Sequence, residues 1–271
     1  MILSGADQSA PANAPVFLLA GGGRTGSTLI QRLIVSTGRV LVWGEHGGFL
    51  LPQLAALIEQ TGQWVTDVHG DRMREDFLAG ASDGWIANMN PEQSAFRSGI
   101  RGFLDQSLGA TAHAVGYPRW GFKEIRYGAA EALLLQTLYP GACFVLLVRN
   151  PISCLRSIKA MGWYGSDFQS DPTIFLGQWA RITAGLMDAL PLLGNACLLR
   201  YEDAVSDPEA TIDRIATVIG VPPSSFDRKV LDSVLRGHAP APVPLSDEDR
   251  HALNESAIRT LAGRLGYPSP G

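Results

Sequence analysis

The fold is decided by the stretch Val16-Phe17-Leu18-Leu19-Ala20-Gly21-Gly22-Gly23-Arg24-Thr25-Gly26-Ser27-Thr28. An apolar run stops at three glycines, and apolar residues then recur at helical spacing as far as Gly38. This order predicts a strand, a glycine loop and a helix. Such a loop can point successive backbone N–H groups and the helix N-terminus at an anion. We therefore expect an anion site here, the alternative being a tight turn that binds no ligand.

Four further apolar runs predict the other strands of a sheet. They are residues 39–44 (RVLVWG), 120–125 (WGFKEI), 143–148 (CFVLLV) and 196–201 (ACLLRY). Helical patterns separate them, including 131–138 and 151–161, where Pro151 takes a favoured first-turn position. Strands of consecutive apolar residues that alternate with helices are typical of a parallel sheet covered on both faces.

These patterns predict one α/β domain over residues 16–271, with a central parallel sheet of about five strands flanked by helices. We expect an architecture similar to that of the P-loop nucleotide kinases. Residues 1–15 are expected to be a flexible N-terminal tail. Residues 49–119 lack a strand pattern and are expected to form a mostly helical insertion, a lid on the acceptor side.

The C-terminal segment predicts one long helix. Ser246 followed by Asp249 has the pattern of a capping box. Leu253, Ala257, Leu261 and Leu265 then form a single apolar stripe.

The composition excludes several classes of protein. Of 271 residues, 46% are hydrophobic and 18% are charged, which excludes disordered, coiled-coil and collagen-like chains. The formal net charge of −4 argues against a protein that coats nucleic acid. An anionic small ligand remains compatible with this charge if the cations gather in one pocket.

Cysteine usage and hydropathy indicate the compartment. Cys143, Cys154 and Cys197 are too few for a disulfide framework, and no Cys/His pattern has zinc-site spacing. The first fifteen residues lack the features of a signal peptide, and no apolar stretch approaches the 18 or so residues of a membrane span. We expect a soluble cytoplasmic protein without a metal; the sequence makes no prediction of oligomeric state.

The glycine loop differs from that of nucleoside triphosphatases. The spacing GxxxxG runs from Gly21 to Gly26, but Ser27 stands where the Walker lysine would be, and Arg24 is the only cation in the loop. Residues 23–29 (GRTGSTL) resemble the 5′-phosphosulfate loop of sulfotransferases that use 3′-phosphoadenosine 5′-phosphosulfate (PAPS).

A second motif supports this resemblance. Arg149-Asn150-Pro151 follows an apolar run, and Ser157 lies eight residues after Arg149, which is similar to the family's 3′-phosphate motif. At this spacing Arg149 and Ser157 can hold one phosphate between a guanidinium and a hydroxyl. The resemblance implies PAPS as the co-substrate and adenosine 3′,5′-bisphosphate as the product. The residues it implies for cofactor binding are Gly23, Arg24, Thr25, Gly26, Ser27, Thr28, Arg149 and Ser157.

Weaker matches and departures complete the resemblance. Residues 199–203 (LRYED) and 121–124 (GFKE) are similar to segments that follow or end core strands in the family. Leu29 stands where the cytosolic branch has a tryptophan that stacks on adenine, and the C-terminal Arg-Lys-Gly loop is missing. The chain is closer to the bacterial and glycan-type branch.

The catalytic groups follow from the chemistry of sulfuryl transfer. In-line attack requires neutralisation of charge on the transferring group and leaving oxygen, for which Arg24, the loop amides and Lys123 are candidates. The glycan-type branch uses a glutamate after the second strand as general base. Glu45, 21 residues after Arg24, matches it, and His46 is the reserve. The alternatives are an ion-pair or capping role for Glu45 and a solvated surface position for Lys123.

The sequence thus predicts sulfuryl transfer from PAPS to a hydroxyl, or less often an amine, of a small-molecule or glycan acceptor. Trp163 and Tyr164 are candidates to line the acceptor or the nucleotide, or else to pack in the core. One alternative is a P-loop kinase or NTPase, against which the missing lysine counts, as does Arg149-Asn150 where a Walker B aspartate would stand. Another is a non-catalytic nucleotide-binding protein on the same fold.

Overall fold

The computed structural model describes residues 13–65, 68–81, 83–84, 86, 89–161, 171–231 and 243–268, with the backbone alone at 63–65 and 68–70. Five parallel strands form one sheet in the order β2-β3-β1-β4-β5. They are β1 (Val16–Ala20), β2 (Val40–Trp43), β3 (Arg119–Glu124), β4 (Cys143–Val148) and β5 (Asn195–Arg200). The predicted α/β class and sheet are confirmed. The predicted tail at residues 1–15 lies mostly outside the described residues.

The central strands of the sheet are apolar on both faces, as is typical of a parallel sheet. Every residue of β1 and β4 is buried. Side chains alternate along β1, so that Val16 and Leu18 enter one hydrophobic core while Phe17 and Leu19 enter another. Helices must therefore cover both faces of the sheet.

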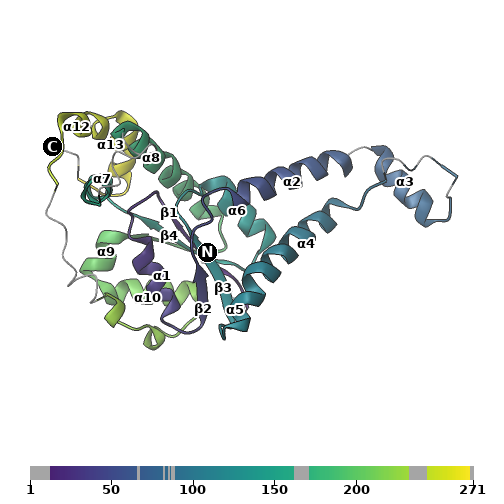
Figure 1. Cartoon of the computed structure of the whole chain (residues 1–271), viewed down its shortest axis with the longest axis horizontal. Helices are drawn as coiled ribbons and strands as arrows, with labels where there is room; N and C mark the ends of the chain where they lie inside the picture. The colour runs from purple at the N-terminus through teal and green to yellow at the C-terminus, as the bar shows by residue number, and fades with distance from the viewer. Residues whose placement is uncertain are drawn as a thin grey trace, which may run out of the picture.

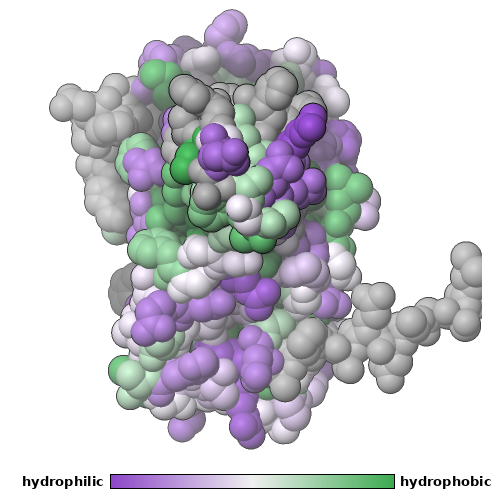
Figure 2. Space-filling model, turned by 90° about the vertical axis from the view of Figure 1, so that its right-hand side faces the viewer, coloured by the Kyte–Doolittle hydropathy of each residue, from purple (hydrophilic) through white to green (hydrophobic). Residues whose placement is uncertain are grey.

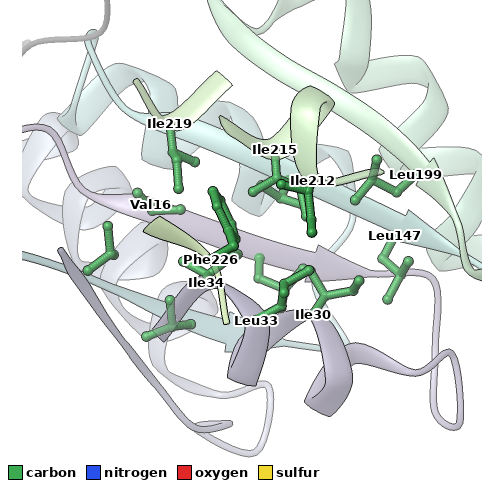
Figure 3. Packing of buried hydrophobic residues seen from close by; sticks show 14 of the residues in the cluster. Val16, Ile30, Leu33, Ile34, Leu147, Leu199, Ile212, Ile215, Ile219 and Phe226 are labelled. Atoms are coloured by element: carbon green, nitrogen blue, oxygen red, sulfur yellow. The ribbon is translucent and has the colours of Figure 1, made fainter. Parts of the chain in front are cut away.

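Helices cover both faces of the sheet. Helices α1 (Ser27–Val35) and α10 (Pro208–Ile219) pack on one side, and α6 (Ala129–Leu138) and α8 (Pro172–Ala189) on the other. Figure 3 shows the first core, where Ile30, Leu33 and Ile34 of α1 approach isoleucines of α10. Each fully buried leucine or isoleucine contributes about 1.5–3 kcal/mol relative to an exposed one. The shorter elements are η1 (Asp105–Gly109), α5 (Ala110–Ala114), α7 (Pro151–Ala160), η2 (Leu190–Leu192), α9 (Tyr201–Ser206) and η3 (Pro223–Ser225).

The insertion between β2 and β3 is helical, as predicted. It contains α2 (Leu50–Val65), α3 (Val68–Leu78) and α4 (Gln93–Leu104). Helices α2 and α4 run side by side and project away from the sheet, with α3 at the far end (Figure 1). We call α2, α3 and α4 the arm. Its role as a lid stays a prediction.

The prediction of one C-terminal helix is wrong. The segment forms two helices, α12 (Asp247–Leu253) and α13 (Ser256–Arg264). Asn254 is the C-cap of α12, and its side-chain amide donates to the carbonyl oxygen of Arg250 at 2.9 Å. The break rotates the apolar face, so that Ile258 is buried and Ala257 is exposed. The capping box is present, with the Ser246 hydroxyl accepting from the Asp249 amide at 3.2 Å.

The turn from β1 into α1 depends on a glycine at position 26. Gly26 has a φ of +88°, in the left-handed region, and precedes the first residue of α1. A Cβ atom here would collide with the ring of Tyr201, which follows β5. Both the backbone conformation and the close approach of β5's end therefore require glycine.

We predict that Gly26→Ala destabilises the fold far more than Gly38→Ala. Gly38 also has a positive φ, +66°, but an added Cβ there meets no atom within 4 Å. Gly38→Ala is the control. Its free energy of unfolding should fall only by the cost of placing alanine in the left-handed region, about 1–2 kcal/mol. For Gly26→Ala the free energy of unfolding should fall by about 1–3 kcal/mol more, because the added Cβ overpacks against Tyr201. Urea unfolding measures both, and equal losses would contradict the account of this turn.

Candidate active site

The carboxyl ends of all five strands meet at one edge of the sheet. Along this edge Glu45 follows β2, Lys123 lies at the end of β3, the glycine loop follows β1, Arg149 follows β4 and Tyr201 follows β5. Open α/β sheets bind ligands at this edge. The central strand places the glycine loop between the basic residues of its two neighbours.

The backbone of the glycine loop forms an anion cradle. Gly22, Arg24 and Gly26 have φ values of +95°, +64° and +88°, whereas the residues between them do not have positive φ. This alternation turns successive N–H groups toward one point. Across the described residues, five loop amides donate to no protein acceptor, and the α1 N-terminus adds its dipole. These five amides are those of Gly23, Thr25, Gly26, Ser27 and Thr28.

The loop hydroxyls divide between two roles. Thr25 is fully buried and donates to the carbonyl oxygen of Gly22 at 3.1 Å, so its side chain closes the loop. Thr28 is exposed and accepts from Lys123 Nζ at 3.4 Å. Of these two predicted cofactor ligands, Thr25 can contribute only its amide.

The two predicted anion motifs are in direct contact. Arg149 Nη1 donates to the carbonyl oxygen of Arg24 at 2.9 Å, and its guanidinium lies 4.1 Å from the ring centroid of Tyr201. Arg24 Nε donates to Ser157 Oγ at 3.1 Å. The guanidinium that touches Ser157 is therefore that of Arg24, a pairing the sequence did not predict. Arg149 Nε is buried and has no hydrogen-bond partner among the described residues.

The two guanidiniums raise the local positive potential. Burial and the neighbouring charge of Arg149 both lower the pKa of Arg24. An anion bound between Arg24 and Arg149 would relieve this repulsion and satisfy the unpartnered Nε–H. The orphaned Nε and the unpaired loop amides therefore fit a ligand with two anionic groups.

The start of α7 is set by polar contacts beside this site. Asn150 caps the helix by accepting from the Ile152 amide at 2.9 Å, and Pro151 occupies the first turn. The backbone N–H of Asn150 donates to Glu202 Oε1 at 3.0 Å. The carboxylate of Glu202 thus holds the end of β4.

Glu45 lies in a cluster of cations on the other side of the loop. Its Oε1 lies 2.9 Å from Lys123 Nζ and its Oε2 lies 3.0 Å from Arg126 Nη1, with 28% of the side chain exposed. Burial raises the pKa of Glu45, but the bonds and charges of Lys123 and Arg126 outweigh it and leave the pKa lowered. Lys123 is buried, so the alternative of a solvated surface lysine is wrong.

His46 is placed differently from Glu45. Its ring packs edge-on against Phe122, with centroids 4.6 Å apart, and both ring nitrogens are buried without a partner in the described structure. Burial lowers the pKa of His46, and the charge of Glu124 only partly opposes this. The imidazole is therefore neutral and packed against the core, and its nitrogens are less accessible than the partly exposed carboxylate of Glu45.

Glu124 is a site residue that sequence reasoning missed. This carboxylate is fully buried, and its Oε2 accepts from the amides of His46 and Gly48 at 2.9 and 3.0 Å. Its Oε1 accepts from the Ile125 amide and from Arg126 Nη1, both at 2.9 Å. Glu124 thereby fixes the loop that carries Glu45. The sequence feature that could have identified Glu124 is a second charged residue next to Lys123 at the end of an apolar strand.

Two further findings concern ligands and membranes. Wherever the structure describes the chain, it groups no three His, Cys, Asp or Glu side chains that could hold a metal ion. None of the described helices is long and apolar enough to cross a bilayer. Trp163 and Tyr164, the predicted lining residues, lie outside the described residues.

Solved structures of several known proteins are similar to this fold. The chain is similar in structure to the sulfotransferase domain from the curacin biosynthetic pathway, with a TM-score of 0.55 and 19% identity over 95% of this chain and 99% of that one. It is also similar to the sulfotransferase domain of the Synechococcus PCC 7002 olefin synthase, with a TM-score of 0.53 and 18% identity over 100% of both chains. Sulfotransferase STF9 from Mycobacterium avium gives a TM-score of 0.52 and 15% identity over 97% of this chain and 79% of that one.

These similar structures show the fold, and the match to a sequence-family model shows the family to which the chain belongs. None of the curated sequences compared with the chain matches it. The model of the sulfotransferase family matches residues 15–225, which include the strands, the glycine loop and the arm. The chain belongs to the sulfotransferase family.

Proposed function

We propose that this protein transfers the sulfuryl group of PAPS to a hydroxyl of a small-molecule or glycan acceptor and releases adenosine 3′,5′-bisphosphate. The observation that carries the proposal is the contact of the two anion motifs through Arg24, whose carbonyl oxygen accepts from Arg149 and whose Nε donates to Ser157. One continuous cradle then serves both anionic ends of the donor. A triphosphate site would need the lysine that Ser27 replaces.

Each part of the cradle has a role in donor binding. The loop amides and Arg24 hold the 5′-phosphosulfate, and Arg149 holds the 3′-phosphate through donors that include its unpartnered Nε. During transfer the acceptor oxygen bonds to sulfur while the bond from sulfur to the phosphate oxygen breaks. The negative charge left on that oxygen is stabilised by fixed cations and amides.

Lys123 connects donor binding to the base. Its ammonium contacts both Thr28 of the glycine loop and Glu45, which supports a position for it between the bound donor and the carboxylate. We infer that donor binding draws Lys123 toward the phosphosulfate. Glu45 then loses part of its charge neutralisation and becomes a stronger base for the acceptor proton.

The compartment is also part of the proposal. Cys143, Cys154 and Cys197 are free thiols, and burial raises the pKa of each, to about 12 for Cys154 and Cys197. Such thiols are inert packing groups that suit a reducing environment. We propose the cytoplasm.

Arg149→Ala should weaken binding of adenosine 3′,5′-bisphosphate by about thirtyfold or more. The variant removes a charged partner of the 3′-phosphate, a loss of at least 2 kcal/mol or so. Arg156→Ala is the matched control, because Arg156 lies on α7 but is exposed. Calorimetric titration measures both affinities; equal binding by the two variants would place the 3′-phosphate elsewhere.

Glu45→Gln should lower kcat about 10²- to 10⁴-fold, the usual contribution of a general base. The amide keeps the shape of the side chain but cannot take the proton, so bisphosphate affinity should stay within about twofold of wild type. Full turnover by Glu45→Gln would show that Glu45 is not the general base. The same substitution test would then be applied to His46.

Arg126→Met should move the acidic limb of the pH profile of kcat/KM to higher pH. Glu45 must be ionised to act as base, and its lowered pKa keeps it ionised as pH falls through the usual carboxyl range. Removing Arg126 takes away one of two cations, so the pKa rises and activity is lost at a higher pH. Arg101→Met is the control, since this exposed arginine of the arm pairs with Asp105, the first residue of η1. An unshifted limb in Arg126→Met would exclude Glu45 as the titrating base.

A further inference from the structure

Helix α8 lies along the glycine loop. Phe175, Trp179 and Thr183 are spaced i, i+4 and i+8, which places them on one face of α8. The three glycines at positions 21–23 face these side chains in reverse order. A Cβ atom added at position 21 would meet Thr183, one at position 22 would meet Trp179, and one at position 23 would meet Phe175. The loop backbone therefore packs directly against α8.

Trp179 is the central side chain of this face and is fully enclosed. Some large apolar side chains of this protein do lie at the surface: Figure 2 shows hydrophobic surface around the arm, and Phe103 of α4 is 51% exposed. Trp179, in contrast, is 1% exposed and belongs to a hydrophobic cluster with Val148 of β4 and Cys154 of α7. Its indole N–H is removed from water and therefore needs an acceptor inside the protein.

That acceptor is the backbone carbonyl of Arg149. Trp179 Nε1 donates to this oxygen at 3.0 Å, and Arg149 Nη1 in turn donates to the carbonyl oxygen of Arg24 at 2.9 Å. Gly22 stands two residues before Arg24, and the position of its absent Cβ lies 3.5–3.9 Å from the Cα, Cβ and Cδ1 atoms of Trp179. The contacts form a closed ring through Trp179, the glycine loop and Arg149.

This ring of contacts opposes a repulsion between the two anion motifs. Burial and the charge of Arg149 both lower the pKa of Arg24, because the two guanidiniums are close and carry the same charge. The indole of Trp179 fixes the main chain of Arg149 without adding a further charge. An anion site whose donors are fixed in advance loses less free energy to ordering when its ligand binds.

We propose that Trp179 is a positioning residue for the donor, because it holds Arg149 at the distance from the glycine loop that a 3′,5′-bisphosphate requires. It acts through the backbone of Arg149. This inference rests on the proposed function and adds to it the residue that couples the two anion motifs.

Trp179→Phe separates the two contacts of this side chain. Phenylalanine keeps the Cα, Cβ and Cδ1 atoms that face the glycine loop, but it has no N–H for the carbonyl of Arg149. Trp120→Phe is the matched control, because Trp120 is also buried but packs against Phe17 and Tyr139 near the amino ends of the strands. Thermal unfolding establishes that each variant is folded before it is titrated.

The test is calorimetric titration of wild type and both variants with adenosine 5′-monophosphate and with adenosine 3′,5′-bisphosphate. These ligands differ only in the 3′-phosphate, so the ratio of their Kd values measures what that phosphate adds. Trp179→Phe should lower this ratio about three- to tenfold, the effect of one lost hydrogen bond, and should leave the Kd of the monophosphate within about twofold of wild type. Trp120→Phe should keep the wild-type ratio.

A merely structural role for Trp179 gives a different result. The variant would then weaken both ligands alike and leave the ratio unchanged, and that outcome would overturn the proposal. In an Arg149→Ala background, Trp179→Phe should have no further effect on the Kd of the bisphosphate, because Trp179 acts through Arg149. A full additional loss in this background would also overturn it.

The same titrations distinguish this proposal from the proposed function. A wild-type ratio near one would reject a 3′-phosphate site at Arg149, and with it both the donor and the role of Trp179. A large wild-type ratio that Trp179→Phe retains would reject the role of Trp179 alone. If Trp179→Phe does not fold, Trp179→Tyr, whose larger ring also lacks the indole N–H, takes its place with the same expected ratios.

Discussion

The backbone of the glycine loop has to alternate its φ sign, and the rest of the site is arranged around that constraint. Glycine meets it at positions 22 and 26, but Arg24 adopts a left-handed φ of +64°, at a cost of about 1–2 kcal/mol. Two contacts offset this cost, one from Arg149 to the Arg24 carbonyl and one from Arg24 Nε to Ser157. The strained residue is thus held by the motif that follows β4.

The same constraint explains how the two halves of the site cooperate. The strained conformation turns successive loop amides toward one point and sends the Arg24 side chain toward α7, while Lys123 reaches Thr28 from β3. Residues that follow β1 and β4, and Lys123 on β3, are therefore linked by contacts in the structure without a ligand. The buried carboxylate of Glu124 accepts from the amides of His46 and Gly48 and so also fixes the loop that carries Glu45. A preorganised site of this kind needs little rearrangement when charge develops in the transition state.

Much of this arrangement follows from local sequence patterns. Apolar runs of buried strands and the glycine loop are local features, and the parallel topology brings their carboxyl ends together. The sheet was predictable for this reason, as was the shared edge of Glu45, Lys123 and Arg149.

Contacts between distant residues were not predictable. The pairing of Arg24 with Ser157 depends on a backbone angle that sequence does not show in a residue other than glycine. The role of Glu124 depends on the path of a loop 76–78 residues earlier in the chain. The break at Asn254 keeps the apolar period almost intact, so periodicity alone predicted one helix.

The central claim is that the two anion motifs form one site for a 3′,5′-bisphosphate. Thermal unfolding with adenosine 3′,5′-bisphosphate, compared with ATP–Mg²⁺, tests it most directly. At about 100 times Kd the bisphosphate should stabilise the protein by about 2.7 kcal/mol, which raises Tm by roughly 5 °C or more, while ATP–Mg²⁺ should have little effect. Stabilisation by ATP–Mg²⁺ without stabilisation by the bisphosphate would contradict the claim.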